Sequence, residues 1–269
     1  MAKKYHKVLA IAGSDPSGGA GIQADLKTIS SLGCYGLTVI TALTAQNTLG
    51  VAAVRPVPVS FAEKQLETLF RDTGADSVKV GMVYSSELIK AVARALRKYD
   101  AKNIVLDPVL VSQSGKRLLK EEAIVTLKDH LVPLATIMTP NLPEAACLSG
   151  HPLHTPDDRR SAVRELASLG SRYILLKGGH SEDDICNDLL YRASDERFTV
   201  FPGQRILTRN DHGTGCTLSS AIACYLAQGL PMEEAVGRAK QYVTRALEAG
   251  AGFALGRGRG PLHHFFDMW

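Results

Sequence analysis

Short apolar runs alternate along this chain with segments in which apolar residues recur every three or four positions. The runs Val8–Ala12 and Val39–Leu43 have the length and composition of strands that are buried in a parallel sheet. This alternation predicts an α/β fold with a doubly wound, mostly parallel central sheet and helices on both faces. Neither an internal repeat nor a long linker interrupts the pattern, so residues 1–269 are expected to form a single domain.

The later elements follow the same alternation. Further strands are expected within 51–59, 78–80, 104–106, 137–138 and 173–176. Segments 189–191 and 198–201 predict a small antiparallel hairpin at the edge of the sheet. A loop is expected at 112–116. Helix starts are expected at a capping box formed by Ser60 and Glu63, at Ser85 or Ser86, and at Thr155–Pro156.

Composition and charge exclude several classes of protein. Hydrophobic residues make up 45% of the chain and charged residues 22%, which is ordinary for a globular domain. The formal net charge of +4 is too small to indicate a nucleic-acid partner, but it is compatible with an anionic small molecule. No run approaches the ~20 apolar residues of a membrane span. The five cysteines lack a CxxC pair and favour a reducing compartment, so a cytoplasmic protein without membrane or nucleic-acid partners is expected.

The expected strands end at polar or glycine residues. In open α/β sheets the ligand binds outside the carboxyl ends of the strands, so these residues are expected to meet at one rim. The strand ends are Asp15, Gln46, Gly81, Asp107, Asn141 and Lys177.

A glycine-led helix start in the segment 209–220 is the strongest single indication of a phosphate site. Gly213 and Gly215 precede a long segment with helical spacing. The unpaired N–H groups and positive dipole end of such a helix favour a phosphate, although an ordinary helix start has the same pattern. The chain lacks the GxxxxGK motif followed by Ser or Thr, and Gly213-x-Gly215 lacks the third glycine of a dinucleotide fingerprint. A P-loop enzyme and a Rossmann dehydrogenase are therefore not favoured.

Five segments, in this order, resemble one known group of enzymes. They are AGSDPSGGAGIQADLK (12–27), TALTAQNT (41–48), TPNLPEA (139–145), KGGH (177–180) and HGTGCT (212–217). Nearly end to end, the chain is similar to the ribokinase-like superfamily and, within it, to the hydroxymethylpyrimidine and phosphomethylpyrimidine kinases of thiamin biosynthesis. Pyridoxal kinases share much of the pattern.

The resemblance implies an ATP- and Mg²⁺-dependent kinase with a ribokinase-like fold. Its substrate would be the pyrimidine alcohol 4-amino-5-hydroxymethyl-2-methylpyrimidine, and then the monophosphate, which becomes the diphosphate. The superfamily often dimerises, so a homodimer is expected. The alternatives are a pyridoxal or pyridoxine kinase and a non-catalytic vitamin-sensing binding module.

The roles of the phosphate-binding residues agree with the physics of phosphoryl transfer, in which positioning and charge stabilisation do most of the work. The N–H groups of 213–216, from Gly213, Thr214, Gly215 and Cys216, would face the transferred phosphoryl group. Asp107 and Glu144 are suitable Mg²⁺ ligands, with help from Asn141. Lys177 would contact a phosphate as a point charge. Glu144 has a competing interpretation as a helix first-turn carboxylate, and Lys177 as a solvated lysine.

The acceptor ring is expected to bind Gln46, because a carboxamide complements the donor and acceptor edge of an aminopyrimidine. The resemblance adds Asp25 and Gly13, and Met82 would pack on the ring. Gln46 holding a turn and Met82 filling the core are the alternatives.

Cys216 stands where many superfamily members carry an aspartate as general base. A thiol at a helix N-terminus can have a lowered pKa, so Cys216 is expected to act as a thiolate base, or else as a residue lining the anion hole. His212 is expected to be either a neighbour of the phosphate or an ordinary loop residue, and in neither case a catalytic one. The tail 256–264 is expected to close the structure near the site.

Overall fold

The computed structural model describes residues 3–110, 119–179 and 186–269, so the expected loop at 112–116 and His180 lie outside the described residues. The strands are β1 Lys7–Ser14, β2 Tyr35–Asn47, β3 Gly50–Pro56, β4 Ser77–Val80, β5 Ile104–Leu106, β6 Ile137–Met138, β7 Tyr173–Leu176, β8 Asp188–Arg192 and β9 Arg197–Phe201. The helices are α1 Gly21–Ser31, α2 Val59–Asp72, α3 Ser86–Lys98, α4 Glu121–His130, the 3₁₀ turn η1 Val132–Leu134, α5 Leu142–Ser149, α6 Pro156–Ser168, α7 Thr214–Ala227 and α8 Met232–Gly250.

The strands join into one nine-stranded sheet of order β3-β2-β1-β4-β5-β6-β7-β8-β9. Neighbouring strands are parallel from β2 to β7. The predicted antiparallel hairpin is β8–β9. The segment expected within 51–59 is β3, which pairs antiparallel with β2 at the opposite edge, so both edges of the sheet are antiparallel.

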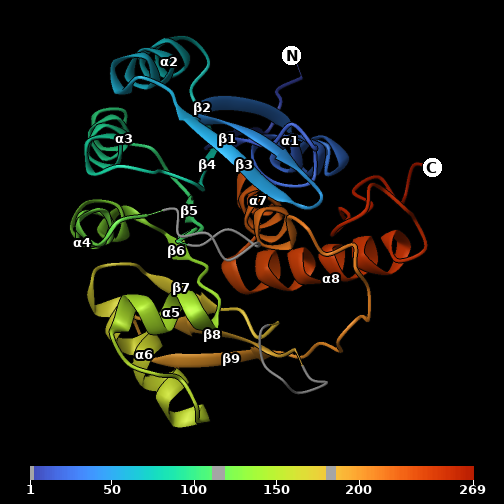
Figure 1. The fold of residues 1–269 in the computed structure, drawn as a ribbon. Coiled ribbons are helices and arrows are strands. Elements are labelled where there is room, and N and C mark those ends of the chain that lie inside the picture. Colours follow the sequence, from blue (N-terminus) through green and yellow to red (C-terminus); the bar gives the residue numbers. More distant parts are fainter. Residues whose placement is uncertain (1–2, 111–118, 180–185) are drawn as a thin grey trace.

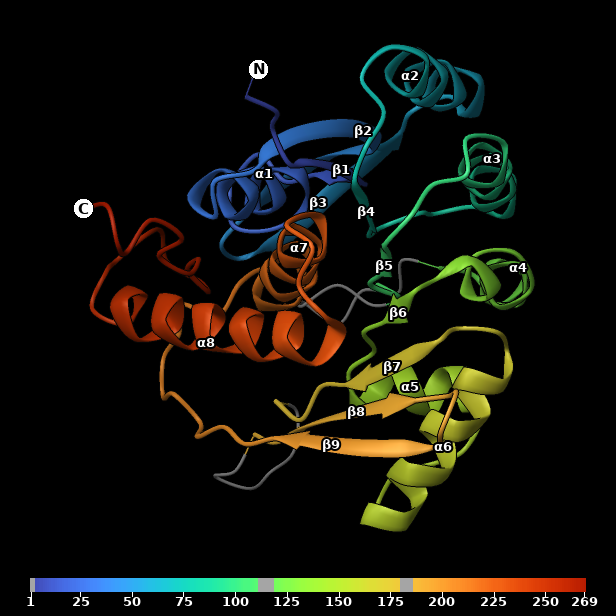
Figure 2. The same cartoon turned by 180° about the vertical axis from the view of Figure 1, so that it is seen from behind.

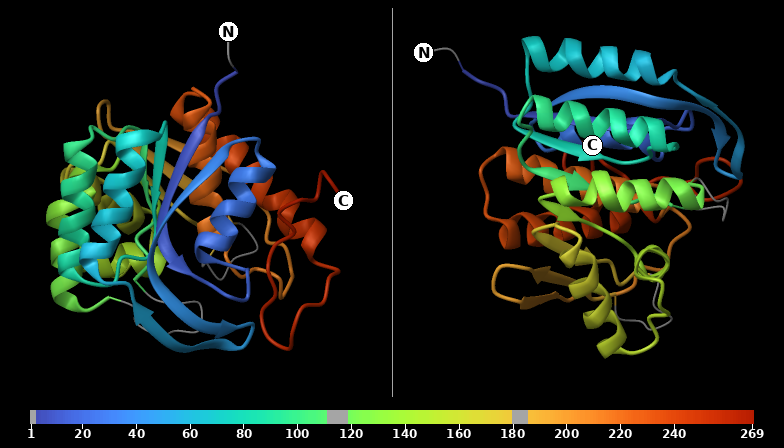
Figure 3. Two further views of the ribbon diagram at one scale, coloured as in Figure 1. Left: turned by 90° about the horizontal axis from the view of Figure 1, so that it is seen from above. Right: turned by 90° about the vertical axis from the view of Figure 1, so that its left-hand side faces the viewer.

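Helices cover both faces of the sheet, as the alternation predicted (Figure 1). Within β1, Leu9 and Ile11 pack into the core beneath α2 to α6, whereas Val8 and Ala10 pack into the core beneath α1, α7 and α8. The views from behind and from above show these two layers on either side of the sheet (Figures 2 and 3). The doubly wound α/β fold is therefore confirmed. Within the described ranges, none of the helices combines the length and the apolar character needed to cross a bilayer.

The helix starts agree with the sequence in two of three places. The Ser85 hydroxyl accepts a hydrogen bond from the Leu88 N–H at the start of α3, and Thr155 caps α6. The capping box expected from Ser60 and Glu63 is wrong. The N-cap is Pro58, two residues before Ser60, and α2 begins at Val59 without a side-chain cap, because the proline already has the φ of a helix entry.

Candidate active site

A cavity of about 920 Å³ opens at the carboxyl ends of the parallel strands. A cavity of this size is typical of a small-molecule site. Eleven residues singled out from the sequence line it: Gly13, Gln46, Met82, Asp107, Asn141, Glu144, Lys177, Gly213, Thr214, Gly215 and Cys216. Five of the six expected strand ends, Asp15, Gln46, Asp107, Asn141 and Lys177, therefore gather at one rim, whereas Gly81 does not line the cavity. Asp25 does not line this cavity.

Asp107, directly after β5, and Lys177, directly after β7, form the charged centre of the cavity. Lys177 Nζ lies 2.9 Å from Asp107 Oδ1. The hydroxyls of Thr139 and Ser219 also donate to the Asp107 carboxylate, each at 3.3 Å. Burial alone would raise the pKa of Asp107, but the ammonium of Lys177 holds it below its usual range. The pair therefore presents a fixed ammonium beside an ionised carboxylate.

Glu144 and Asn141 form a capping box at the start of α5. The Asn141 amide oxygen accepts from the Glu144 N–H, and Glu144 Oε2 accepts from the Asn141 N–H, both at 2.8 Å. The competing interpretation of Glu144 as a helix first-turn carboxylate is thus correct for its local contacts. Yet the same carboxylate lines the cavity, 3.9 Å from Lys177 Nζ. Burial raises its pKa to about 7 despite that lysine, and Asp107 adds to the rise.

The donor set at this rim fits a magnesium ion. Two carboxylates, from Asp107 and Glu144, face one cavity, and Mg²⁺ is typically held by one or two carboxylates together with waters and substrate phosphates. Because burial raises the pKa of Glu144 even beside Lys177, a further cation in the cavity would stabilise its ionised form. Among the described residues, no cluster of three or more His, Cys, Asp or Glu side chains surrounds a common point.

The predicted glycine-led start of α7 is present. Gly213 caps the helix with φ +87°, a left-handed conformation that disfavours any side chain, and a Cβ there would collide with the Gly19 carbonyl. The Thr214 N–H donates to the Asp211 carbonyl at 3.3 Å, and so does its hydroxyl, at 2.7 Å. Because Thr214 is engaged in this turn, the N–H groups of Gly215 and Cys216 are the better phosphate donors. A Cβ on Gly215 would lie 3.3 Å from Lys177 Nζ.

The expected lowering of the Cys216 pKa is wrong. Burial, reinforced by the carboxylates of Asp25 and Asp107, raises the pKa of the thiol to about 11, although the Lys79 ammonium opposes the rise. Desolvation therefore outweighs the dipole of α7, and the thiol carries its proton at neutral pH in this structure.

Gln46, Met82 and Gly13 also line the cavity. Gln46 follows a register shift in the β2–β3 ladder between Ala45 and Gln46, and such bulges turn a side chain out of the regular alternation. A Cβ on Gly13 would lie 3.1 Å from Met82 Cε, so the absent side chain leaves room at this wall.

Asp15 and His212 line the cavity too, although neither was among the residues predicted to bind substrate, nucleotide or metal. His212 Nε2 lies 2.9 Å from Asp15 Oδ2 and 3.2 Å from Gln46 Nε2. Burial opposes ionisation of Asp15, but hydrogen bonds from His212, Ser17 and Ala20 lower its pKa to about 2. Two features of the sequence could have indicated a binding role. Asp15 follows a predicted strand, and His212 directly precedes the segment that contains Gly213 and Gly215.

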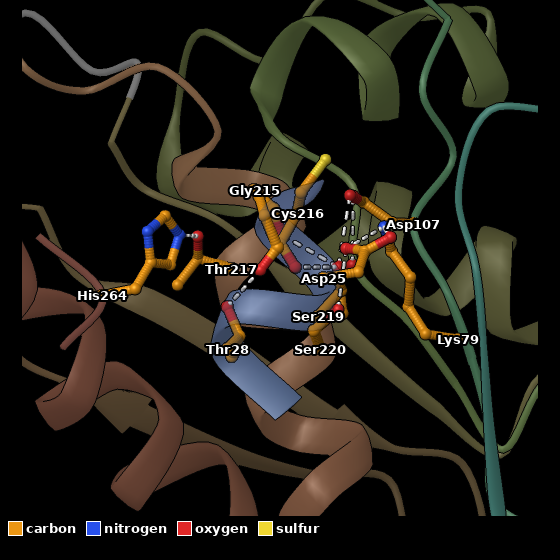
Figure 4. A network of polar contacts seen from close by, with 12 residues as sticks. Asp25, Thr28, Lys79, Asp107, Gly215, Cys216, Thr217, Ser219, Ser220 and His264 are labelled. Carbon is orange, nitrogen blue, oxygen red and sulfur yellow. Dashed lines mark hydrogen bonds and ion pairs between the residues drawn. The ribbon is translucent and has the colours of Figure 1, made fainter. Parts of the chain in front are cut away.

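Asp25 lies beneath the cavity in a fully buried ion pair (Figure 4). Its two carboxylate oxygens accept from Lys79 Nζ at 2.7 and 2.9 Å, and Oδ1 also accepts from the Ser220 hydroxyl at 2.8 Å. These contacts link α1, β4 and α7. Of the pair, only Lys79 belongs to the cavity wall, and its side chain is fully buried there. The substrate contact expected for Asp25 stays a prediction.

The tail packs at the site. The His212 N–H donates to the Gly260 carbonyl, and the Gly260 N–H donates to the Arg209 carbonyl. The Arg259 N–H donates to the Thr48 carbonyl at the β2–β3 turn, and Arg259 itself lines the cavity. The tail therefore closes the structure beside the cavity.

Known proteins share this architecture. Residues 15–263 match the family model described as phosphomethylpyrimidine kinase. The chain is 49% identical to the thiamine biosynthesis bifunctional protein ThiED of Geobacter sulfurreducens over 96% of its own length, but it spans 52% of that protein. It is 47% identical to the hydroxymethylpyrimidine/phosphomethylpyrimidine kinase of Rhizobium meliloti, and the match covers 97% of both chains.

A solved structure with a different activity is also similar. An ADP complex of Bacillus subtilis pyridoxal kinase superposes with a TM-score of 0.90 at 38% identity, covering 97% of this chain and 98% of that one. The family match spans most of the sequence and includes the cavity-lining residues from Asp15 onward. The chain belongs to the phosphomethylpyrimidine kinase family, the phosphotransferases that its five motif segments resemble.

Proposed function

We propose that this protein uses ATP and Mg²⁺ to phosphorylate the hydroxymethyl group of 4-amino-5-hydroxymethyl-2-methylpyrimidine, and then its monophosphate, in thiamin biosynthesis. One observation carries the proposal: the phosphate-type groups and the amide suited to an aminopyrimidine line the same cavity. The name of the Rhizobium meliloti relative, which is similar over nearly its whole length, supports the choice of substrate.

In this proposal, Lys177 and the start of α7 bind the transferred phosphoryl group. The ammonium lies at the charged centre, close enough to the helix start that a Cβ on Gly215 would touch it. The N–H groups of Gly215 and Cys216 would stabilise the charge that develops on the phosphoryl oxygens, and removing one such donor typically costs about 3 kcal/mol of barrier stabilisation. Asn141 and Thr214 complete the nucleotide side.

Asp107 and Glu144 would hold the magnesium ion. When bound, the ion neutralises phosphate charge and orients the transferred group. The Asp107–Lys177 contact keeps the carboxylate ionised. Glu144 must lose its proton to act as a ligand, and a cation in the cavity would favour that loss.

Gln46, Met82 and Gly13 would bind the pyrimidine ring, with the hydroxymethyl group directed at α7. Because the Cys216 thiol is protonated at neutral pH, we favour its role as a lining residue over that of a thiolate base. The proton of the acceptor hydroxyl then leaves late, which a loose phosphoryl-transfer transition state allows. A Cys216→Ala variant that loses about 10²-fold in kcat but still binds substrate would restore the base role.

Pyridoxal kinase activity is the second candidate, because the Bacillus subtilis structure is so similar. ADP release should be measured with purified protein, MgATP and either the pyrimidine alcohol or pyridoxal. Pyridoxal turnover well above that of the pyrimidine would overturn the proposal. Ligand binding without ADP release would instead identify a non-catalytic vitamin-sensing module.

We further propose a cytoplasmic homodimer in which residues 1–269 act as one catalytic domain. All five cysteines are free, which supports a reducing compartment. Exposed apolar side chains at Leu43 and Leu49 on the β2–β3 hairpin support an interface at that edge. Light scattering of the purified protein measures the assembly, and a monomer would contradict this part.

A further inference from the structure

Two hydrogen-bonding side chains flank the carboxamide of Gln46. One end of the amide lies 3.2 Å from His212 Nε2, and the other lies 3.3 Å from Thr44 Oγ1. The oxygen and nitrogen of a carboxamide have nearly the same shape, so the partners decide which end carries the oxygen.

His212 requires the oxygen to face it. Its Nε2 lies 2.9 Å from Asp15 Oδ2, and Asp15 also accepts hydrogen bonds from the N–H groups of Ser17 and Ala20. An ionised carboxylate can only accept, and the hydrogen bonds that Asp15 receives lower its pKa to about 2. Nε2 must therefore carry the ring's hydrogen, and it has no lone pair left with which to accept from an amino group. While this N–H donates to Asp15, only the oxygen end of the Gln46 amide is a favourable neighbour at 3.2 Å, where it can share the same hydrogen.

Thr44 requires the amino group to face it. The Thr44 hydroxyl donates to the Ser14 carbonyl at 2.9 Å. A hydroxyl has a single hydrogen, so toward Gln46 it can only accept. Both neighbours thus specify the same orientation, with the amide oxygen toward His212 and the amino group toward Thr44. This is the reverse of the assignment that places Gln46 Nε2 at His212 and Gln46 Oε1 at Thr44, and the two ends of a carboxamide are distinguished only by such contacts.

We propose that His212 and Thr44, held by Asp15 and the Ser14 carbonyl, are positioning residues that fix the orientation of the Gln46 carboxamide and so make the site selective for an amino group over a keto group on the pyrimidine. This rests on the proposed function, which places the ring against Gln46. The fixed amide offers the ring one acceptor and one donor in a set order. A 4-aminopyrimidine edge supplies the matching donor and acceptor, whereas the 4-keto form supplies the reverse order. The ring cannot turn over to compensate, because its hydroxymethyl group must reach the phosphoryl donor at α7.

The test compares kcat/KM for the 4-amino alcohol with that for its 4-keto analogue. Asp15→Asn places an amide donor against His212, which favours the tautomer with an accepting Nε2 and reverses the demand on Gln46. We expect the amino-over-keto ratio to fall about tenfold or more while KM for ATP stays within about twofold, since a mismatched, partly buried pair leaves a donor or acceptor unsatisfied. Ser17→Ala is the matched control: it removes the 2.6 Å hydroxyl contact to the same carboxylate but leaves His212 in place, so it should keep the ratio.

A second pair of variants leaves the Asp15 loop intact. Thr44→Val removes the acceptor and should lower the same ratio, whereas Thr44→Ser restores the hydroxyl and should recover it. Unchanged ratios in both Asp15→Asn and Thr44→Val would overturn the positioning role. The unsubstituted protein is assayed first. If it does not phosphorylate the aminopyrimidine at all, the proposed function itself fails, and this failure is distinct from a failure of the positioning role.

Discussion

Replacing Lys79 with Met tests whether the buried pair beneath the cavity stabilises the fold. Lys79 is the largest of the fully buried side chains in the described residues, and both oxygens of Asp25 accept from it. Methionine keeps an unbranched apolar stem but removes the ammonium, so Asp25 would be left as a buried charge without its cation. Breaking a buried pair in this way typically costs about 3–5 kcal/mol of unfolding free energy.

The expected fall in Tm follows from this loss of unfolding free energy and the length of the chain. With an unfolding entropy of about 2.1 cal/mol/K per residue, about 4 kcal/mol corresponds to a fall in Tm of roughly 7 °C. Thermal unfolding followed by circular dichroism measures it. Lys64→Met is the matched control, because Lys64 is 67% exposed in its 3.6 Å pair with Glu67 and should cost less than about 1 kcal/mol.

The double variant Lys79→Met/Asp25→Leu distinguishes the effect of the unpaired charge from the effect of changed packing. It removes both charges, so most of the lost stability should return. A fall of less than about 2 °C for the single variant, or a double variant no more stable than the single one, would refute this reasoning. The double variant also tests the substrate contact expected for Asp25: a stable protein with an unchanged pyrimidine KM would exclude that contact.

Three further predictions concern the cavity. Gly215→Ala should lower kcat by about tenfold or more in the coupled ADP assay, because the new Cβ would crowd Lys177 and displace the phosphate; an unchanged kcat would place the phosphate elsewhere. With a pKa of about 11, roughly one Cys216 thiol in 10⁴ is ionised at pH 7, so mass spectrometry should find it alkylated by iodoacetamide far more slowly than the exposed Cys147; equal rates would contradict the burial argument. Because the pKa of Glu144 is raised to about 7 and its proton must leave for Mg²⁺ to bind, calorimetry should show MgADP affinity falling as pH drops from about 8 to 6, by up to about tenfold per unit below 7. Glu144→Gln should remove most of this pH dependence, and a flat profile in the unsubstituted protein would refute the assignment.

The fold was predictable because buried positions recur at regular intervals in the sequence, and the interval differs between helices and strands. Continuous apolar runs mark strands that are covered on both faces, and the polar residues after them must meet at one rim in a parallel sheet. For this reason the sequence alone predicts that Asp107, Asn141 and Lys177 lie at the rim of the sheet, and all three line the cavity.

The missed features depend on neighbours that are distant in sequence. Lys79 stands within an apolar strand, and only the packing of α1 against the sheet supplies its partner, 54 positions away. The pKa of Cys216 was predicted from its place at a helix start, but the sign is set by burial and by carboxylates on other elements. The role of His212 depends on Asp15, which is 197 residues away.

The contact between the tail and the loop before α7 bears on how the enzyme matures during synthesis. The backbone partner of His212 is Gly260, which the ribosome adds after β1 to β9, α7 and α8 have all been made. A nascent chain can therefore pair β1 to β9 while the loop that carries Gly213 still lacks its last anchor. Phosphate binding should be acquired at the end of translation, so fragments that stop before this segment would be folded proteins without turnover.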